Sequence, residues 1–273
     1  MLLSLANFML RVIRWRRYLS LMGHPTRLGF ASLAYVSGFA FSVTPGKLGE
    51  LARMQYYVRA GVPLEDLGGA LFVERLMDLL AALLLASIIS TPFPHYTPIM
   101  LVAAGLTIVC LVVLAALPWS RISIALSPSS SIPRVIVEHL RRVLHALACA
   151  GVLLRVRALT LGLLLGLIAW LLEGAGLCLL GSIVEPGDLT ITAAVGIYAI
   201  SELLGVVSLI PGGLGSTEAV MIALLAARGY AITAAILISL TYRLVTLWLA
   251  VGLGWGAIIA LRHQRPEIRG YKG

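Results

Sequence analysis

Long apolar stretches separated by short polar segments make up most of this chain. Four such stretches, at about residues 64–90, 98–118, 158–182 and 231–261, are each long enough for a helix that crosses a membrane. Residues 1–22 begin apolar and end in a basic, aromatic segment, which predicts a shorter or tilted fifth helix. The pattern therefore predicts an all-α polytopic membrane protein.

Two further apolar regions, at about 28–60 and 190–228, are each interrupted near the middle by proline, glycine and a charged residue. The interruptions read VTPGKLGE, ending at Glu50, and LIPGGLGSTE, ending at Glu218. Proline removes a backbone donor and glycine admits positive φ, so a helix ends or bends there. We therefore predict two broken helical hairpins. Their expected hinge residues are Pro45, Gly46, Gly49, Pro211, Gly212, Gly213 and Gly215.

The two interrupted regions resemble each other beyond the break itself. Glu50 and Glu218 are 168 positions apart in the sequence. The same offset joins further identical residues, namely Gly61 with Gly229, Arg75 with Arg243, Leu76 with Leu244 and Leu79 with Leu247. This spacing favours an internal duplication, and the alternative is two unrelated helix breaks in a chain rich in leucine and alanine.

Composition and charge support a membrane protein and suggest an orientation. The chain is 60% hydrophobic and 12% charged with a mean hydropathy of +0.98, whereas soluble domains are about 25% charged. The net charge of +9 favours contact with anionic lipid headgroups, and a nucleic-acid partner is not expected because no soluble basic region exists. Residues 11–27, 121–157 and 262–273 carry basic clusters and are expected in the cytoplasm. Residues 91–97 and 183–189 lack lysine and arginine and are expected to face outward.

This orientation predicts that the first hairpin enters and leaves on the cytoplasmic side and the second on the outer side. Both would be re-entrant, and three spans between them would make the two copies inverted, an arrangement known from transporters. We expect one transmembrane domain over residues 1–273. It divides into repeat 1 at about 1–90, a connecting span and amphipathic region at about 98–157, repeat 2 at about 158–261, and a basic tail at 262–273.

Two finer predictions concern the membrane surface. Trp15 and Tyr18 follow the first apolar stretch and are expected at the cytoplasmic interface. Apolar residues at helical spacing from Ile132, mixed with arginines, predict either a helix on the cytoplasmic membrane surface or a solvated linker helix.

Ionisable residues gather in and beside both hairpins. Each costs about 2.5–3.5 kcal/mol near the bilayer centre, so they are expected to pair or to line an aqueous cavity. Arg75 and Asp78 lie three positions apart on one helical face, where an ion pair is an equally good interpretation. The candidate substrate-binding residues are Lys47, Glu50, Arg53, Glu74, Arg75, Asp78, Glu218 and Arg243, with Glu173 and Glu202 nearby.

The hairpin tips favour binding of a phosphate group. A helix that starts inside the membrane directs free N–H groups into the cavity, and Lys47, Arg75 and Arg243 would add positive charge. Glu50 and Glu218 would either cap these helices or carry a proton in exchange. The sequence contains no Walker loop, His-Glu-x-x-His or Gly-x-Ser-x-Gly motif, and its three cysteines are scattered. We therefore expect no catalytic residues, metal or cofactor.

Three motifs carry a resemblance to a known family. TPGKLGE at 44–50, ERLMD at 74–78 and IPGGLGSTE at 210–218 resemble the flippase-like family that includes the transmembrane region of bacterial lysylphosphatidylglycerol synthases. The resemblance covers nearly the whole chain and implies translocation of aminoacylated phosphatidylglycerol, polyprenyl-phosphate-linked sugars or other glycolipids. No soluble aminoacyl-transferase domain follows residue 273, so lipid aminoacylation is not expected.

The sequence thus predicts a flippase in a prokaryotic cell membrane that moves an anionic or phosphate-linked lipid without ATP hydrolysis. One alternative is a non-transporting anchor or regulatory subunit of a lipid-modifying or glycosyl-transfer system, which would dock through the helix at 134–157. Another is a membrane transferase that uses Glu50 or Glu74 as a base. Expected partners are the lipid, anionic headgroups, and a lipid-modifying enzyme or a second copy of the chain.

Overall fold

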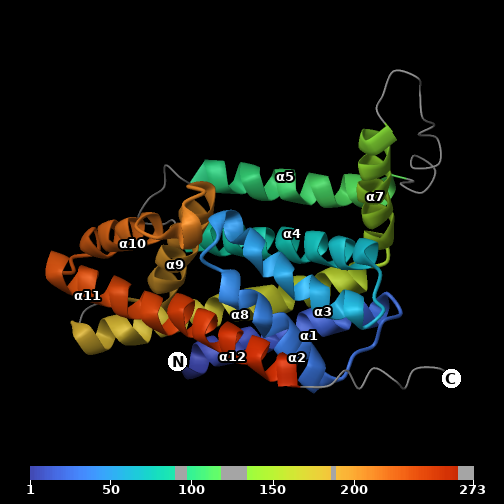
Figure 1. Ribbon diagram of the computed structural model, residues 1–273. Coiled ribbons are helices and arrows are strands. Elements are labelled where there is room, and N and C mark those ends of the chain that lie inside the picture. Colours follow the sequence, from blue (N-terminus) through green and yellow to red (C-terminus); the bar gives the residue numbers. More distant parts are fainter. Residues whose placement is uncertain (90–96, 118–133, 186–188, 264–273) are drawn as a thin grey trace.

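A computed structural model describes residues 1–89, 97–117, 134–185 and 189–263, and every element in these segments is a helix (Figure 1). The helices are α1 Leu2–Leu21, α2 Leu28–Ser37, α3 Met54–Arg59, α4 Leu64–Ile89, α5 Thr97–Ala116, α7 Arg134–Ala150, α8 Val156–Val184, α9 Ile191–Val207, α10 Ser216–Ala226, α11 Ile232–Arg243 and α12 Leu249–His263. Each predicted apolar stretch forms a helix close to its expected bounds. Most of the predicted loop at 91–97, residues 118–133 and most of the basic tail lie outside the described residues.

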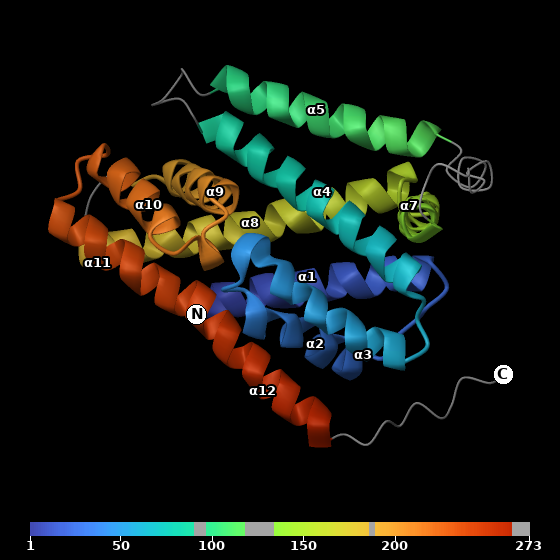
Figure 2. The same ribbon diagram turned by 45° about the horizontal axis from the view of Figure 1, so that its top comes forward.

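Each interrupted region folds into a hairpin. The first runs through α2, the 3₁₀ helices η1 Gly38–Phe41 and η2 Pro45–Arg53, and α3. The second runs through α9, the short 3₁₀ turn η4 Pro211–Gly213, and α10. The α3–α4 turn and the α10–α11 turn lie at opposite ends of the helix bundle (Figures 1 and 2), while the two tips meet inside it. A Cβ atom added to Gly212 would lie 3.2 Å from Cα of Val43, which shows how closely the tips approach.

The helical segment after the first break begins as the 3₁₀ helix η2 rather than as an α-helix, because the chain folds back tightly at this tip. The Gly49 N–H donates to Thr44 Oγ1 at 2.6 Å, and a Cβ atom at Gly49 would lie 2.7 Å from the Phe41 carbonyl oxygen. Gly49 is therefore required for close approach and not for positive φ. In the second tip, Gly212, Gly213 and Gly215 have φ values of 63°, 63° and 85°, which L-residues rarely adopt.

Both hairpins end in the same backbone cap. Gly61 and Gly229 have φ values of 87° and 91°. The Gly61 N–H donates to the Val58 carbonyl and the Gly229 N–H to the Ala226 carbonyl, each at 2.9 Å. The N–H of the following residue, Val62 or Tyr230, donates to the carbonyl five positions earlier, and this second hydrogen bond completes a Schellman motif. These caps lie 168 positions apart, the offset that relates the two regions in the sequence.

The bundle has its polar groups inside and apolar groups outside. On α5, Leu101, Val102 and Leu106 are exposed by more than half, whereas Arg14 and Glu74 are each 1% exposed. This reverses the pattern of soluble proteins and suits a lipid environment. Within the part of the chain that the structure describes, α8 and the continuous helix Ile232–His263 are long and apolar enough to cross a membrane.

The continuous helix Ile232–His263 contains a π-helical turn, η5 Leu244–Trp248, directly after Arg243. Such turns are rare in proteins overall, but those that occur often lie at functional sites. On the other side of the bundle, α7 crosses the ends of α4 and α5 (Figure 1) and packs on α4 where Gly69 leaves room for the backbone of Ala146 and Ala150. Whether α7 rests on a membrane surface stays a prediction.

The expectation for the end of the first helix is wrong in two respects. Arg14 does not project from the bundle as part of a basic surface segment but lies in the core, and Arg11 also turns inward to pair with α4. Trp15 and Tyr18 are not at an interface, because each is at most 1% exposed. The cause is that α1 packs along α8 and against α4, so its polar face meets the acidic residues of those helices.

Candidate functional site

A buried ion-pair cluster joins α1, α4 and the first hairpin. Glu74 of α4 lies 2.5 Å from Arg53 Nη2 and 3.4 Å from Arg14 Nη2. Asp78, one turn further along α4, lies 2.7 Å from Arg14 Nη1 and 2.8 Å from Arg11 Nη1. The cluster therefore ties three elements that are distant in the sequence.

Aromatic side chains enclose this cluster. The Arg53 guanidinium carbon lies 4.2 Å from the ring centroid of Trp15 and 4.0 Å from that of Tyr35, a cation–π arrangement. The Tyr35 hydroxyl donates to Glu74 Oε1 at 2.6 Å. Arg53 is 0% and Glu74 1% exposed, so solvent and substrate reach neither in this conformation. The geometry favours the structural interpretation for both residues, and it leaves Glu74 poorly placed to act as a base.

Arg75 follows Glu74 but points to a different partner. Its Nη2 lies 2.5 Å from Glu50 Oε2 at the first hairpin tip, and Ser42 Oγ donates to Glu50 Oε1 at 3.1 Å. Arg75 and Asp78, for which an ion pair was one of two interpretations, do not pair with each other, because Asp78 turns to α1 while Arg75 turns to the tip. The Arg75 side chain is 41% exposed, whereas Glu50 is 9% exposed.

Arg243 occupies the corresponding place in the second hairpin. Its Nε lies 2.7 Å from Glu218 Oε1 and its Nη1 2.9 Å from Glu202 Oε1. Its Nη2 donates to the Gly212 carbonyl at 2.5 Å, so one side chain holds α9, the tip and α10 together. Glu218 Oε2 accepts the Gly215 N–H at 2.6 Å, which confirms that Glu218 caps the helix after the tip.

The two arginine–glutamate pairs have identical sequence spacing. Arg75 and Arg243 each lie 25 positions after their glutamate partner, Glu50 or Glu218. They differ in accessibility, because the Arg243 side chain is only 6% exposed. The sequence offset of 168 therefore relates not only single residues but also the ion pairs that they form.

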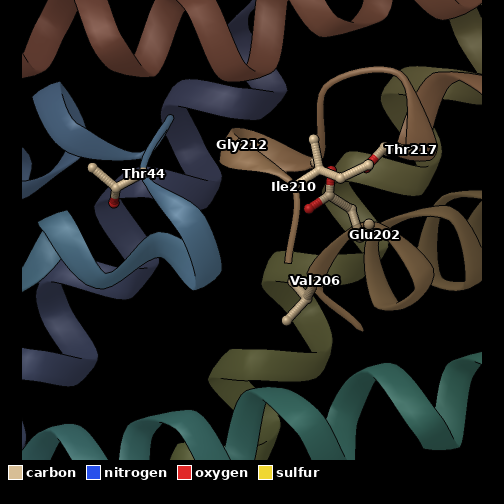
Figure 3. Close-up of a pocket in the computed structure, with 8 residues that line it drawn as sticks. Thr44, Glu202, Val206, Ile210, Gly212 and Thr217 are labelled. Atoms are coloured by element: carbon tan, nitrogen blue, oxygen red, sulfur yellow. The ribbon is translucent and has the colours of Figure 1, made fainter. Parts of the chain in front are cut away.

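A small pocket opens between the two hairpin tips (Figure 3). Thr44 lines it from the first hairpin, while Ile210, Gly212 and Thr217 line it from the second and Glu202 from α9. Gly213 approaches Thr217 so closely that an added Cβ atom would lie 2.6 Å from the threonine Oγ1. Two of the predicted hinge glycines, Gly212 and Gly213, thus form part of the wall of a pocket that lies between the tips.

Three predicted residues of the first tip, Pro45, Gly46 and Lys47, belong to η2 by their backbone, and the side chains of Pro45 and Lys47 lie outside the described residues. Within the described residues, no group of three or more histidine, cysteine or acidic side chains could hold a metal ion.

The sequence analysis did not identify the part of the network that comes from α1. Ser4, Asn7, Arg11 and Arg14 recur at intervals of three or four, which places them on one face of a helix. That polar stripe in an otherwise apolar segment was the available signal. Tyr35 and Tyr242 carried no such signal, because a single tyrosine in an apolar helix is usual.

Comparison with known proteins identifies one family. The model described as "Lysylphosphatidylglycerol synthase TM region" matches residues 1–254, which confirms the resemblance inferred from the three motifs. Comparisons with curated proteins and with solved structures found no match.

Proposed function

Because the chain belongs to the lysylphosphatidylglycerol synthase transmembrane family, we propose that it is a flippase for an anionic or phosphate-linked lipid. Transport would proceed without ATP hydrolysis and without a catalytic residue or cofactor. The observation that carries the proposal is a half-exposed arginine, Arg75, held by Glu50 where two broken hairpins meet inside the bundle.

The proposal places both hairpins in the membrane as re-entrant, inverted copies. Three observations support it. The two hairpins open at opposite ends of the bundle. Their Arg–Glu pairs have the same sequence spacing of 25, and their C-terminal caps have the same pattern of hydrogen bonds. A broken helix at membrane depth requires protein or water around its free backbone groups. The contact between the tips and the pocket beside them meet that requirement.

Arg75 is the described cation best suited to meet a lipid phosphate. A guanidinium donates two parallel hydrogen bonds to a phosphate, and such charge-assisted contacts are strong in poorly solvated sites. A phosphate would displace Glu50, which retains the Ser42 hydroxyl as a donor. Lys47 would add a second cation from the same tip, as proposed from the sequence.

The test is lipid movement by the purified chain in liposomes that contain a fluorescent anionic lipid, measured by quenching from outside. Arg75→Ala should reduce binding and movement about ten- to a hundredfold, because a charge-assisted contact contributes about 1.5–3 kcal/mol. Arg142→Ala is the matched control, since it removes an arginine whose partner is Glu138 on the exposed face of α7. If both variants move the lipid as well as the parent, the phosphate site is misplaced.

A second pair of variants tests the tip itself. Lys47→Ala should weaken anionic lipid binding, while Lys47→Arg should retain most of it. Equal behaviour of both variants and the parent would favour a purely structural role for the charges at this tip.

The chief alternative is a membrane anchor or regulatory subunit of a lipid-modifying enzyme or a glycosyl-transfer system. It is favoured by the outer face of α7, where Leu140 and Val143 are exposed beside Arg141 and Arg142. Such a subunit would bind its enzyme and leave the lipid where it is. A chain that converts the lipid in the same liposomes would instead be a transferase.

A further inference from the structure

Glu173 lies near the middle of α8 and faces the interior of the bundle. It is 2% exposed and contacts side chains of α1 and α11. Asn7 Nδ2 donates to Oε1 at 2.5 Å, the Tyr242 hydroxyl lies 2.8 Å from Oε2, and Ser4 Oγ lies 3.5 Å from Oε2. All three of these groups are neutral.

Glu173 stands apart from the ion pairs around it. Among the described residues of the two polar clusters, five arginines pair with five carboxylates. The arginines are Arg11, Arg14, Arg53, Arg75 and Arg243, and the carboxylates are Glu50, Glu74, Asp78, Glu202 and Glu218. Glu173 is a sixth carboxyl group with no basic side chain within ion-pair distance in the described structure. An ionised carboxylate here would leave a buried charge uncompensated, which is costly inside a membrane.

The charged and titratable groups that surround Glu173 are already engaged. On α1, the Arg11 Nε–H donates a hydrogen bond to Asn7 Oδ1, and its Nη1 donates one to Asp78 Oδ2 of α4. On α9, Glu202 binds Arg243, and the Tyr198 ring packs on Tyr242 at 5.7 Å between centroids. None of them neutralises a charge on Glu173.

The hydrogen-bond geometry specifies where a proton would lie. Tyr242 has one hydroxyl proton but lies 2.7 Å from the Glu173 main-chain oxygen and 2.8 Å from Oε2. If it donates to the main-chain oxygen, Oε2 satisfies the second contact only by donating its own proton to the tyrosine oxygen. Arg11 donates to Asn7 Oδ1 at 2.9 Å, which turns the Asn7 amide N–H toward Oε1. A neutral carboxylic acid therefore satisfies each of these contacts.

We propose that Glu173 is a proton-binding site that carries one exchangeable proton on Oε2, and that release of this proton is coupled to movement of the hairpins. Glu173 is buried in the present conformation, so release requires the hairpins to move and admit water. The proton then passes to that water and a negative charge stays on the carboxylate. Tyr242 then turns its hydroxyl proton from the main-chain oxygen to Oε2. Arg243 directly follows Tyr242 and is followed by the π-turn. The change at Tyr242 therefore acts directly on Arg243, the clamp that holds α9, the tip and α10 of the second hairpin together. The coupling to lipid transport rests on the proposed function, whereas the proton site does not.

The proton site is tested by infrared spectroscopy on the full chain in lipid nanodiscs at neutral pH. The parent should show the C=O band of a protonated carboxyl group, shifted in D₂O, and Glu173→Gln should lack it. Glu138→Gln is the matched control, because it removes an exposed glutamate from α7 and should retain the band. Tyr242→Phe should shift the band, since it removes the tyrosine partner. An unchanged band in Glu173→Gln, or its absence from the parent, would overturn the proposal.

The coupling is tested in liposomes with a pH gradient and a fluorescent anionic lipid. The parent should move lipid at a rate that depends on the gradient, and Glu173→Gln should move it at a rate that does not. Gradient dependence that persists in Glu173→Gln overturns the coupling. If the infrared band is assigned to Glu173 but the parent moves no lipid, the proton site stands and the proposed function fails. If the parent moves lipid but the band is absent, the inference fails and the proposed function stands.

Discussion

The two hairpins carry the same arginine–glutamate pair in different surroundings. In the second hairpin, Arg243 contacts Glu202, Glu218 and the Gly212 carbonyl, and its side chain is 6% exposed. In the first, Arg75 is 41% exposed and its closest acidic partner is Glu50. One copy therefore closes its hairpin with the arginine, while the other leaves part of the arginine accessible.

This difference follows from how each tip is stabilised. The first hairpin is held by a separate buried arginine, Arg53, which binds Glu74 and stacks on Trp15 and Tyr35. The second hairpin has Met221 at the position that the offset of 168 relates to Arg53, so Arg243 has to hold it. Under the proposed function, the same residue type thus holds one hairpin together and meets the lipid in the other.

The largest expected effect is an all-or-none difference in labelling. Pro63 and Ala231 are exposed residues 168 positions apart, directly after the two caps. Pro63→Cys and Ala231→Cys should react with an impermeant thiol reagent from opposite sides of the membrane, because the hairpins open at opposite ends of the bundle. Reaction from the same side would refute the inverted arrangement.

The native cysteines need replacement for this experiment. Cys110 is exposed, while burial and a hydrogen bond to nearby Asp66 raise the pKa of the Cys149 thiol to about 12. Cys149 should therefore react slowly at neutral pH, and replacing all three native cysteines removes the remaining background. Arg142→Cys, on α7, should label from the same side as Pro63→Cys.

Arg243→Ala should cause the largest loss of stability among single substitutions at the two pairs. It leaves Glu202 and Glu218 near each other without the guanidinium that holds them, and removing one partner of a buried pair costs about 3–5 kcal/mol. The measurement is a thermal melt in detergent. Arg243→Lys should restore little, because an ammonium group cannot reproduce the fork of three contacts. A melt equal to that of the parent would show that the clamp is dispensable.

Two glycine substitutions separate strain from crowding at the second tip. Gly213→Ala and Gly215→Ala both place an L-residue at positive φ, which costs on the order of 1–3 kcal/mol at each site. At Gly213 the new Cβ atom also meets Thr217 Oγ1, whereas nothing lies within 4 Å at Gly215. Gly213→Ala should therefore be less stable by a further 1–3 kcal/mol or so, and Gly213→Val less stable still. Equal melting temperatures for the two alanine variants would show that the tip is not tightly packed.

Arg75→Ala should have the smallest effect on stability, although it is expected to have a large effect on lipid movement. Its pair with Glu50 is partly exposed, and such pairs contribute about 1 kcal/mol or less. The melt should therefore stay close to that of the parent. A loss as large as that of Arg243→Ala would mean that both arginines serve as clamps and would remove the difference between the hairpins.

The sequence by itself determined the elements, the breaks and the family. Apolar length and proline–glycine interruptions are local properties, so the bounds of α4, α5 and α8 and both hairpin tips could be predicted within a few residues. The offset of 168 anticipated which residues correspond between the hairpins, and the structure adds that Arg75 and Arg243 bind corresponding glutamates.

Only the tertiary structure decided which charged groups meet. Arg75 and Asp78 lie on one helical face, where a pair between them was one interpretation, yet Asp78 binds α1 and Arg75 binds the hairpin tip. Helical spacing fixes the direction of a side chain relative to its own helix but not which distant helix stands opposite. For the same reason the sequence could not show that Arg14 faces the core, or that Glu173 lies among neutral donors, because both depend on the packing of α1 against α8.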